Sequence, residues 1–145
     1  MATLQLDIIT QENAVLSEAV DQVSAPAVTG ELTILPGHIP LFTRLADGIL
    51  KIKQPGRYRE IALVGGFMDV SPRNQVTIMA DSAIMAETAN EAKAEAARVK
   101  AVEAMQEQVS DFSYKQAEIS LRKAVMELKV ARRRRESQSR PVISE

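Results

Sequence analysis

The chain has 145 residues, an apolar fraction of 46% and a formal net charge of -1, which suits one compact domain or one domain with an appendage. It contains no cysteine, so disulfides, thiolate metal ligands and cysteine nucleophiles are excluded. Aromatic residues make up only 3% and tryptophan is absent, which argues against the stacking platforms of single-strand nucleic-acid binders.

Residues 1–86 contain short runs in which apolar and polar residues alternate, a pattern typical of β-strands. In the first run Leu4, Leu6 and Ile8 fall on one face. The expected strands are Leu4 to Ile9, Ala14 to Ser17, Ala19 to Ala27, Gly30 to Leu35, Gly48 to Lys53, Arg59 to Val64, Phe67 to Val70 and Gln75 to Ala80. Many short strands separated by turn residues predict an antiparallel β-sandwich or flattened barrel.

The stretch from Gly30 to Leu41 predicts a strand followed by a rigid loop. Pro36 presets φ, Gly37 can adopt a positive φ, and Pro40 favours an extended residue before it. The charged residues Glu31 and His38 lie at either end of this strand and turn, where a loop can present them to a partner. Spacing alone also allows a plain hairpin with a solvated glutamate and a lone histidine.

The pair Gly65-Gly66 resembles a phosphate-binding loop only superficially, because no lysine, third glycine or helix start follows it. We therefore predict a bulge or a close approach of two backbones at this point.

Residues 87–135 predict two helices joined by a short turn, an antiparallel hairpin. Seven alanines lie between Ala89 and Ala104, without glycine or proline. Thr88 is the expected N-cap, with Glu91 completing a capping box. The expected apolar stripe is Ala92, Ala96, Val99, Val102, Met105 and Val109.

The second helix is expected over residues 113–135, capped by Asp111 or Ser113. Its apolar residues follow the 3-4 spacing of a helix–helix contact; they are Tyr114, Ala117, Leu121, Ala124, Leu128 and Ala131. Alanine buries little area, so we expect the hairpin to be marginally stable and able to detach. Residues 136–145 are expected to form a flexible tail.

Charge is distributed unevenly along the chain. Residues 113–135 contain eight basic and two acidic side chains, a net charge of +6, whereas residues 1–112 are acidic. This polarity indicates either an arm that binds an acidic surface or a solvated helix face.

No apolar run approaches the ~18 residues that span a bilayer, and the first five residues lack the positive start of a signal peptide. We therefore expect a soluble chain that reaches a membrane only through a partner.

Three stretches resemble the epsilon subunit of the bacterial F-type rotary ATP synthase: Gly30 to Leu41, Ala62-Leu-Val-Gly-Gly-Phe, and Asn74-Gln-Val-Thr-Ile-Met-Ala-Asp. The resemblance extends through the helices and covers almost the whole chain. It implies a ten-stranded sandwich that binds the gamma subunit and the c-ring, and a hairpin that restrains ATP hydrolysis in the alpha/beta catalytic head. It also implies a non-catalytic subunit, peripheral to the cytoplasmic face of the cell membrane, in a proton-translocating complex.

The resemblance assigns two sets of contact residues. The rotor-facing loop corresponds to Glu31, Pro36, Gly37, His38, Ile39 and Pro40. The inhibitory helix corresponds to Lys115, Arg122, Lys123, Lys129, Arg132, Arg133, Arg134 and Arg135.

Some members of this family also bind ATP within the hairpin through an Asp and an Arg on the first helix and arginines on the second. The matching positions here hold Asn90, Lys93, Gln116, Lys123 and Glu127. Lysine cannot replace the guanidinium fork at a bidentate phosphate site, and Glu127 would repel phosphate. Asn90, Lys93 and Lys123 are thus a weak candidate ATP site, and we expect no cofactor.

Two other classes of function are open to the sequence. The run Arg132 to Arg135 would bind nucleic-acid phosphates in a salt-dependent way, but the acidic chain lacks a nucleic-acid-binding motif, so no nucleic-acid partner is expected. A hydrolase could use His38 as a general base. One histidine cannot build a multi-histidine metal site, and no nucleophile elbow is present, so neither enzyme activity nor a metal is expected.

Overall fold

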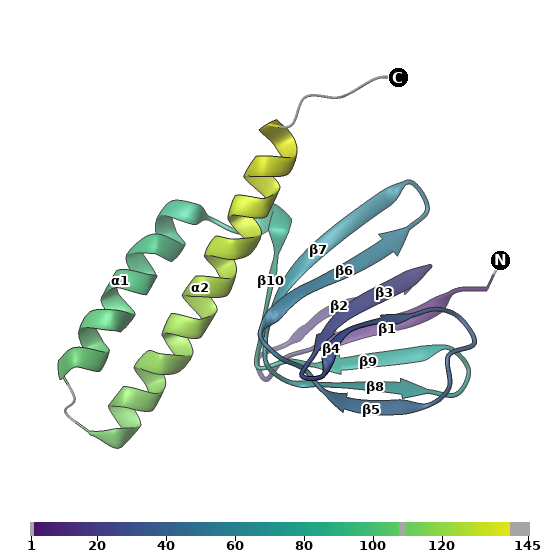
Figure 1. The fold of residues 1–145 in the computed structure, drawn as a ribbon, viewed down its shortest axis with the longest axis horizontal. Coiled ribbons are helices and arrows are strands. Elements are labelled where there is room, and N and C mark those ends of the chain that lie inside the picture. The colour runs from purple at the N-terminus through teal and green to yellow at the C-terminus, as the bar shows by residue number, and fades with distance from the viewer. Residues whose placement is uncertain (1, 108–109, 140–145) are drawn as a thin grey trace. The chain divides into compact units, whose positions relative to one another are not determined.

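The computed structural model describes residues 2–107 and 110–139, and the chain folds as two compact units, Met1–Ile84 and Met85–Glu145. The first unit is a β-sandwich and the second is a helical hairpin, which confirms the predicted fold class (Figure 1). The boundary lies two residues before the one expected from the change of sequence pattern.

The sandwich consists of two sheets. The strands are β1 Leu4–Ile9, β2 Ala14–Val20, β3 Gln22–Ala27, β4 Gly30–Ile34, β5 Leu41–Arg44, β6 Gly48–Gln54, β7 Arg57–Val64, β8 Phe67–Ser71, β9 Gln75–Met79 and β10 Ser82–Met85. One sheet has the order β2-β1-β9-β8-β5 and the other the order β10-β7-β6-β3-β4. The ten strands of the described residues match the number that the family resemblance implies.

The sandwich is not wholly antiparallel, because β1 pairs with β9 in parallel, with Leu6 opposite Val76. The chain leaves the first sheet after β2, returns to it for β5, leaves it again for β6 and β7, and returns through β8 and β9. The β8–β9 hairpin then places β9 beside β1 in the same direction. A parallel pair needs such a long excursion, which local alternation in the sequence cannot reveal.

The sandwich core follows the predicted alternation. Leu4, Leu6 and Ile8 of β1 are fully buried, while Gln5 and Ile9 on the opposite face are exposed. Burial of each such side chain contributes about 1.5–3 kcal/mol. This core makes the first unit the rigid part of the chain.

Most strand boundaries differ from the predicted ones by one to three residues, and three differences are larger. The single run expected from Ala19 to Ala27 is split at Asp21, whose amide donates to Lys53 O at 2.8 Å. The bend moves the chain from β2 in one sheet to β3 in the other. Strands β5 and β10 were not predicted, since each has only four residues and follows a proline or a polar turn.

The prediction for Gly65-Gly66 is confirmed as a close backbone approach. Gly66 has a φ of +111°, and a Cβ on it would lie 2.1 Å from Met79 O. Its own carbonyl accepts a hydrogen bond from Leu45 N at 2.8 Å. Only glycine allows β8 to start this close to the end of β9.

The second unit consists of a 3-10 turn, η1 (Ala86–Thr88), and two helices, α1 (Glu91–Glu107) and α2 (Asp111–Ser139). The helices lie side by side and run in opposite directions (Figure 1). Four of the six predicted seam residues of α2 are buried: Ala117, Ala124, Leu128 and Ala131. Leu121 is half-buried and Tyr114 is exposed, so the seam loosens towards the start of α2.

The predicted stripe of α1 is wrong. Ala92, Ala96 and Val99 are exposed, and the buried residues of α1 are Ala94 and Ala101. In a helix so rich in alanine, several faces have similar hydropathy. The larger Val99 made an exposed face look like the buried one. The half-buried Val102 and Met105 flank the true seam, and Val109 lies outside the described residues.

The helix caps also differ from the prediction. Asn90 caps α1, since its Oδ1 accepts from Lys93 N at 2.9 Å, while the Thr88 hydroxyl donates to Met85 O. Ser110 caps α2, with its Oγ accepting from Ser113 N at 3.1 Å. Asparagine and serine are both strong N-cap residues, so sequence preference alone did not separate them from Thr88 and Asp111.

Helix α2 continues to Ser139, four residues beyond the predicted end at Arg135. The predicted flexible tail over residues 136–145 is therefore wrong for its first four residues. Residues 140–145 lie outside the described part of the chain.

We predict that Gly66→Ala lowers the free energy of unfolding of the sandwich by ~3 kcal/mol, because backbone strain and a clash with Met79 O add. Gly56→Ala is the matched control: Gly56 also has a positive φ, +66°, but a Cβ added there would meet nothing within 4 Å, so strain alone costs about 1 kcal/mol. Urea denaturation of both variants measures the difference. Equal losses would contradict the close approach.

Candidate functional sites

The loop at residues 35–40 has a fixed backbone. His38 N donates to Leu35 O at 3.1 Å and closes a turn in which Gly37 has a φ of +88°. Gly37 N donates to Asn74 Oδ1 at 2.7 Å. Asn74 belongs to the turn between β8 and β9 and itself has a positive φ of 61°, a conformation that asparagine tolerates. A second turn therefore holds the loop in shape.

The two charged residues predicted for this loop are held differently. The half-buried His38 places Nδ1 2.6 Å from Ile39 O, and since a carbonyl can only accept, Nδ1 carries a proton. Glu31 is exposed on β4 and pairs with Lys51 Nζ at 3.4 Å. Such an exposed ion pair contributes below ~1 kcal/mol. Glu31 is thus held weakly and can change partners at little cost.

The tip of the loop is apolar. Ile39 is 74% exposed and Leu35 is 52% exposed, while Pro36 is half-buried and Pro40 is exposed. A rigid loop that keeps large aliphatic side chains in water has the character of a binding surface.

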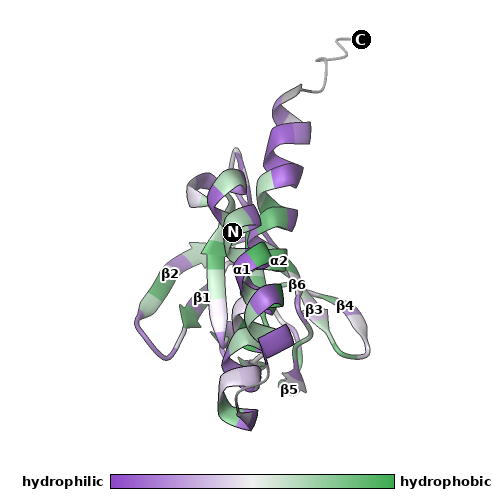
Figure 2. Cartoon of the chain, turned by 90° about the vertical axis from the view of Figure 1, so that its left-hand side faces the viewer, coloured by the Kyte–Doolittle hydropathy of each residue, from purple (hydrophilic) through white to green (hydrophobic). Residues whose placement is uncertain are grey.

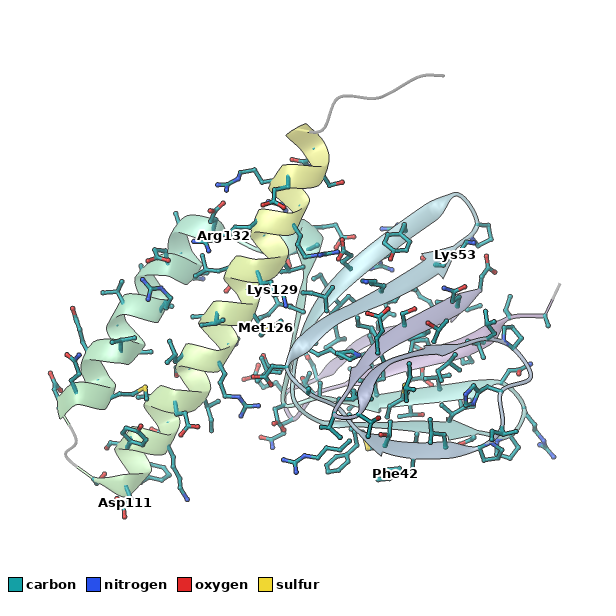
Figure 3. All side chains as sticks on the ribbon, in the orientation of Figure 1. Phe42, Lys53, Asp111, Met126, Lys129 and Arg132 are labelled. Atoms are coloured by element: carbon teal, nitrogen blue, oxygen red, sulfur yellow. The ribbon has the colours of Figure 1, made fainter. Side chains whose placement is uncertain are left out.

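The sheet that contains β5 also carries apolar side chains on its outer face. Phe42 and Phe67 stack there with ring centroids 5.5 Å apart, and Phe42 points outward from β5 (Figure 3). Met79 lies opposite Phe67 in the β8–β9 pair and opposite Ile9 in the β1–β9 pair. We call Ile9, Met79, Phe67 and Phe42 the apolar row; all four are at least 40% exposed.

The apolar row was not predicted from the sequence, although the alternation of β8 contains a signal for it. Met68 and Val70 are buried in β8, so alternation places Phe67 on the outward face. A large aromatic side chain on the outward face of a strand is the kind of residue that partner surfaces enrich.

Beside the apolar row the same outer face is polar. Asp7 accepts hydrogen bonds from the Ser17 hydroxyl at 2.5 Å and from Gln75 Nε2 at 2.5 Å. The Ser17 hydroxyl is the main cause that lowers the pKa of Asp7 below its ordinary value, against a smaller opposing effect of burial. The charged carboxylate thus bridges β1 to both neighbouring strands.

One end of the hairpin is held by polar contacts. The carboxylate of Glu91, at the start of α1, accepts from Arg135 Nη1 at 2.9 Å through both oxygens and from Arg132 Nε at 3.4 Å. Arg134 Nη1 donates to Ala86 O and Glu87 O, both at 2.8 Å. Arg132, Arg134 and Arg135 all belong to the predicted inhibitory set, and their side chains bond within the hairpin.

The other predicted cations lie along α2, whose last turns are strongly hydrophilic (Figure 2). Lys115, Lys123, Lys129 and Arg133 are exposed, and Arg122 is half-buried. Lys115, Arg122 and Lys129 are seven residues apart, so they share one face of the helix. We call these three residues the cationic stripe.

Lys129 and Arg132 also line an open groove of about 600 Å³ between the two helices. Figure 3 labels both residues on α2. Arg98 and Glu95 line it from α1 and form a paired contact, with Nη2 to Oε1 at 2.5 Å. The hydrogen bond between the two side chains, together with the attraction of their charges, raises the pKa of Arg98 and lowers that of Glu95. The groove therefore holds charges of both signs and is no simple anion site.

The candidate ATP residues are not assembled into a phosphate site. The Asn90 side chain is used to cap α1 through Lys93 N. Asn90 N donates to Glu127 Oε1 at 3.3 Å, so a carboxylate of α2 lies at the helix N-terminus, where a phosphate would otherwise be favoured. Lys93 and Lys123 are both exposed.

Metal-binding clusters and membrane spans are both absent from residues 2–107 and 110–139. These residues contain no group of three or more His, Asp or Glu side chains arranged to hold a metal ion. Within the same ranges, no helix is both long enough and apolar enough to cross a membrane.

The protein has two parts, a small sandwich and a helical hairpin. The sandwich offers a rigid apolar loop and the apolar row to partners, and the hairpin offers a cationic face. The family model of the ATP synthase, Delta/Epsilon chain, beta-sandwich domain matches residues 3–86. The ATP synthase epsilon chain of Herpetosiphon aurantiacus is 47% identical over 135 residues, which cover 93% of this chain and 98% of the relative. The chain therefore belongs to the family of ATP synthase epsilon chains.

Two further similarities agree with this family. The epsilon chain of Desulforamulus reducens is 40% identical over 129 residues, 89% of this chain and 97% of the relative. A chain in the Euglena gracilis mitochondrial ATP synthase structure, an OSCP/F1/c-ring assembly, matches with a TM-score of 0.66 and 27% identity, covering 84% of this chain and 77% of that chain. The nucleic-acid module considered from Arg132 to Arg135 finds no support in these similarities.

We predict that Asp7 contributes pH-dependent stability. The pKa of Asp7 is lower in the folded chain than in the unfolded chain, so the unfolded chain binds the proton more readily. The contribution of Asp7 to the free energy of unfolding is therefore complete above the ordinary pKa of 3.8 and is lost as the pH falls through the folded pKa. Asp7→Asn should lower the free energy of unfolding at neutral pH by less than ~1 kcal/mol, with the difference from wild type vanishing at low pH. Denaturation between about pH 2 and about pH 6 measures this.

Asp81→Asn, at an exposed aspartate of the same unit, controls for the change in net charge. A constant difference between wild type and Asp7→Asn across the whole range would show that the charge of Asp7 plays no part.

Proposed function

We propose that this chain is a non-catalytic central-stalk subunit of a proton-translocating ATP synthase that links the gamma subunit to the c-ring. It acts as a peripheral subunit at the cytoplasmic face of the cell membrane. The observation that carries this proposal is the rigid loop at residues 35–40, which keeps Ile39 74% exposed on a backbone fixed by Asn74. Torque transmission requires contacts that do not yield, and a preorganised loop meets that requirement.

The sandwich has two surfaces for two rotor partners. The loop with Glu31, His38 and Ile39 faces the c-ring, where the weak Glu31–Lys51 pair allows an exchange of partners. The apolar row provides the more hydrophobic contact and faces the gamma subunit. A permanent interface buries apolar residues of this kind, whereas a surface that stays in water avoids them.

The hairpin restrains ATP hydrolysis by laying α2 against acidic groups of the alpha/beta head. The cationic stripe of Lys115, Arg122 and Lys129 supplies charge along one face of the helix. Several partly desolvated pairs at ~1 kcal/mol or more each would favour the inhibited state by tens-fold to hundreds-fold. ATP has no role as a ligand of the hairpin in this proposal, since Glu127 lies where its phosphates would bind.

The loop proposal predicts that Ile39→Ala and His38→Ala weaken binding to the rotor. The stability of the isolated chain should change by less than ~0.5 kcal/mol for the exposed Ile39 and by about 1 kcal/mol for the half-buried His38, whose ring loses its hydrogen bond to Ile39 O. Tyr58→Ala is the control, because Tyr58 is 61% exposed on the same sandwich but outside both surfaces. Pull-down of the gamma and c-ring partners, with melting curves of each variant, separates assembly from folding. If the variants assemble normally but lose much of their stability, the loop residues stabilise the sandwich core and do not bind the rotor.

The brake proposal predicts that Lys115→Glu with Lys129→Glu raises the ATPase activity of the assembled complex towards the level reached by deleting residues 88–145. These changes leave the contacts of Arg132, Arg134 and Arg135 intact. The assay belongs at low ionic strength, because near physiological salt the interactions are screened beyond ~8–10 Å.

Lys53→Glu with Lys100→Glu is the matched control, since both lysines are exposed and lie off the stripe. Assembly is verified for each complex. If wild type, the stripe variant and the truncated complex then hydrolyse ATP at equal rates, the hairpin does not restrain hydrolysis.

A further inference from the structure

Arg134, near the end of α2, donates hydrogen bonds to residues 86–89, the segment that leads into α1. Its Nη1 donates to Ala86 O and Glu87 O at 2.8 Å, and its Nη2 donates to Ala89 O at 3.3 Å. The three carbonyls belong to the turn η1 and the residue that ends it. Ala86 O also accepts from Ala89 N at 3.4 Å within the turn. The guanidinium therefore adds a charged donor to this carbonyl and also bonds to the carbonyls of Glu87 and Ala89.

The contacts beside Arg134 act on the same segment. Arg135 holds the Glu91 carboxylate through both oxygens at 2.9 Å, and Asn90 N donates to Glu127 Oε1 at 3.3 Å. Four side chains of α2 therefore hold residues 86–91: Glu127, Arg132, Arg134 and Arg135. Among them Arg134 alone bonds to backbone carbonyls ahead of α1, and it is half-buried.

The rest of the hairpin offers little to replace these contacts. The buried residues of α1 are Ala94 and Ala101, and the predicted seam of α2 buries Ala117, Ala124, Leu128 and Ala131. A methyl group buries little area, and the one large buried side chain in this set, Leu128, lies less than two turns before Arg134. Separation of α2 from α1 thus meets its main resistance at the end held by Arg134.

We propose that Arg134 is the latch of the hairpin: its hydrogen bonds to residues 86–89 must break before α2 can leave α1. A guanidinium can hold three carbonyls in one plane, whereas an ammonium group on a flexible chain cannot. The latch is a property of the isolated chain, so it does not depend on the proposed brake on ATP hydrolysis. If the proposed brake also holds, Arg134 and the cationic stripe have opposite roles. Arg134 keeps α2 against α1, whereas the stripe binds the alpha/beta head once α2 has separated.

The test uses the full chain with two introduced cysteines, Ala104→Cys on α1 and Ser120→Cys on α2. Both positions are exposed and the natural chain has no cysteine, so spin labels attach at these sites alone. Arg134→Ala should raise the population of separated helices roughly tenfold to a hundredfold, the change expected for the loss of charge-assisted hydrogen bonds. Pulsed electron paramagnetic resonance would show it as a second, longer distance.

Arg134→Lys, which keeps the charge but loses the fork, should fall between wild type and Arg134→Ala, and Lys100→Ala should match wild type. Hydrogen exchange on the same variants should show faster exchange in residues 86–94 and in α2, with protection in β1 and β9 unchanged as the sign of a folded sandwich. Unchanged distances and exchange in Arg134→Ala would overturn the latch, as would an equal effect of Lys100→Ala.

A second readout in the assembled complex separates the latch from the brake. If both hold, Arg134→Ala lowers ATPase activity, whereas reversal of the stripe raises it. Separated helices in the isolated chain with unchanged ATPase activity would support the latch and overturn the brake.

Discussion

The alanine seam of the hairpin is the constraint on which the behaviour of the second unit depends. Ala94, Ala101, Ala117, Ala124 and Ala131 let the two helices approach closely, yet each buried methyl contributes only about 0.8 kcal/mol. That gain is similar to the conformational entropy lost on ordering one residue. The pairing of the helices consequently relies on a few polar contacts at one end, where Glu91, Arg134 and Arg135 meet.

The sandwich follows the opposite design. Its core consists of fully buried leucine, isoleucine and valine side chains such as Leu6, Ile52 and Ile78, and its exposed loop is held by a hydrogen bond from a distant turn. In the proposed function, the loop surface of the sandwich carries torque and has to be stiff, whereas the hairpin is a regulatory arm that has to move at a small free-energy cost. The chain separates the two demands by giving large side chains to one unit and alanine to the other.

Local patterns predicted the features that depend on local chemistry. Alternation located most strands, glycine located the close approach at Gly66, and the 3-4 spacing located the seam of α2. Features that depend on distant partners were missed: the parallel β1–β9 pair, the hold of Asn74 on Gly37, and the register of α1, whose alanines look alike on every face. The loop residues were proposed from the family resemblance, whereas the apolar row was visible in the alternation and was not predicted.

The four arginines from Arg132 to Arg135 show why a charge run in a sequence is a poor guide to a binding surface. Successive residues on a helix are rotated by about 100°, so a run of four surrounds the helix instead of lining one face. Arg134 accordingly reaches the turn before α1, Arg132 and Arg135 reach Glu91, and Arg133 lies exposed. Residues seven apart, such as Lys115, Arg122 and Lys129, do share a face. A flat acidic partner would therefore meet the sparse stripe before it met the dense run, and arginines bound within the hairpin would become available only after the helices separate.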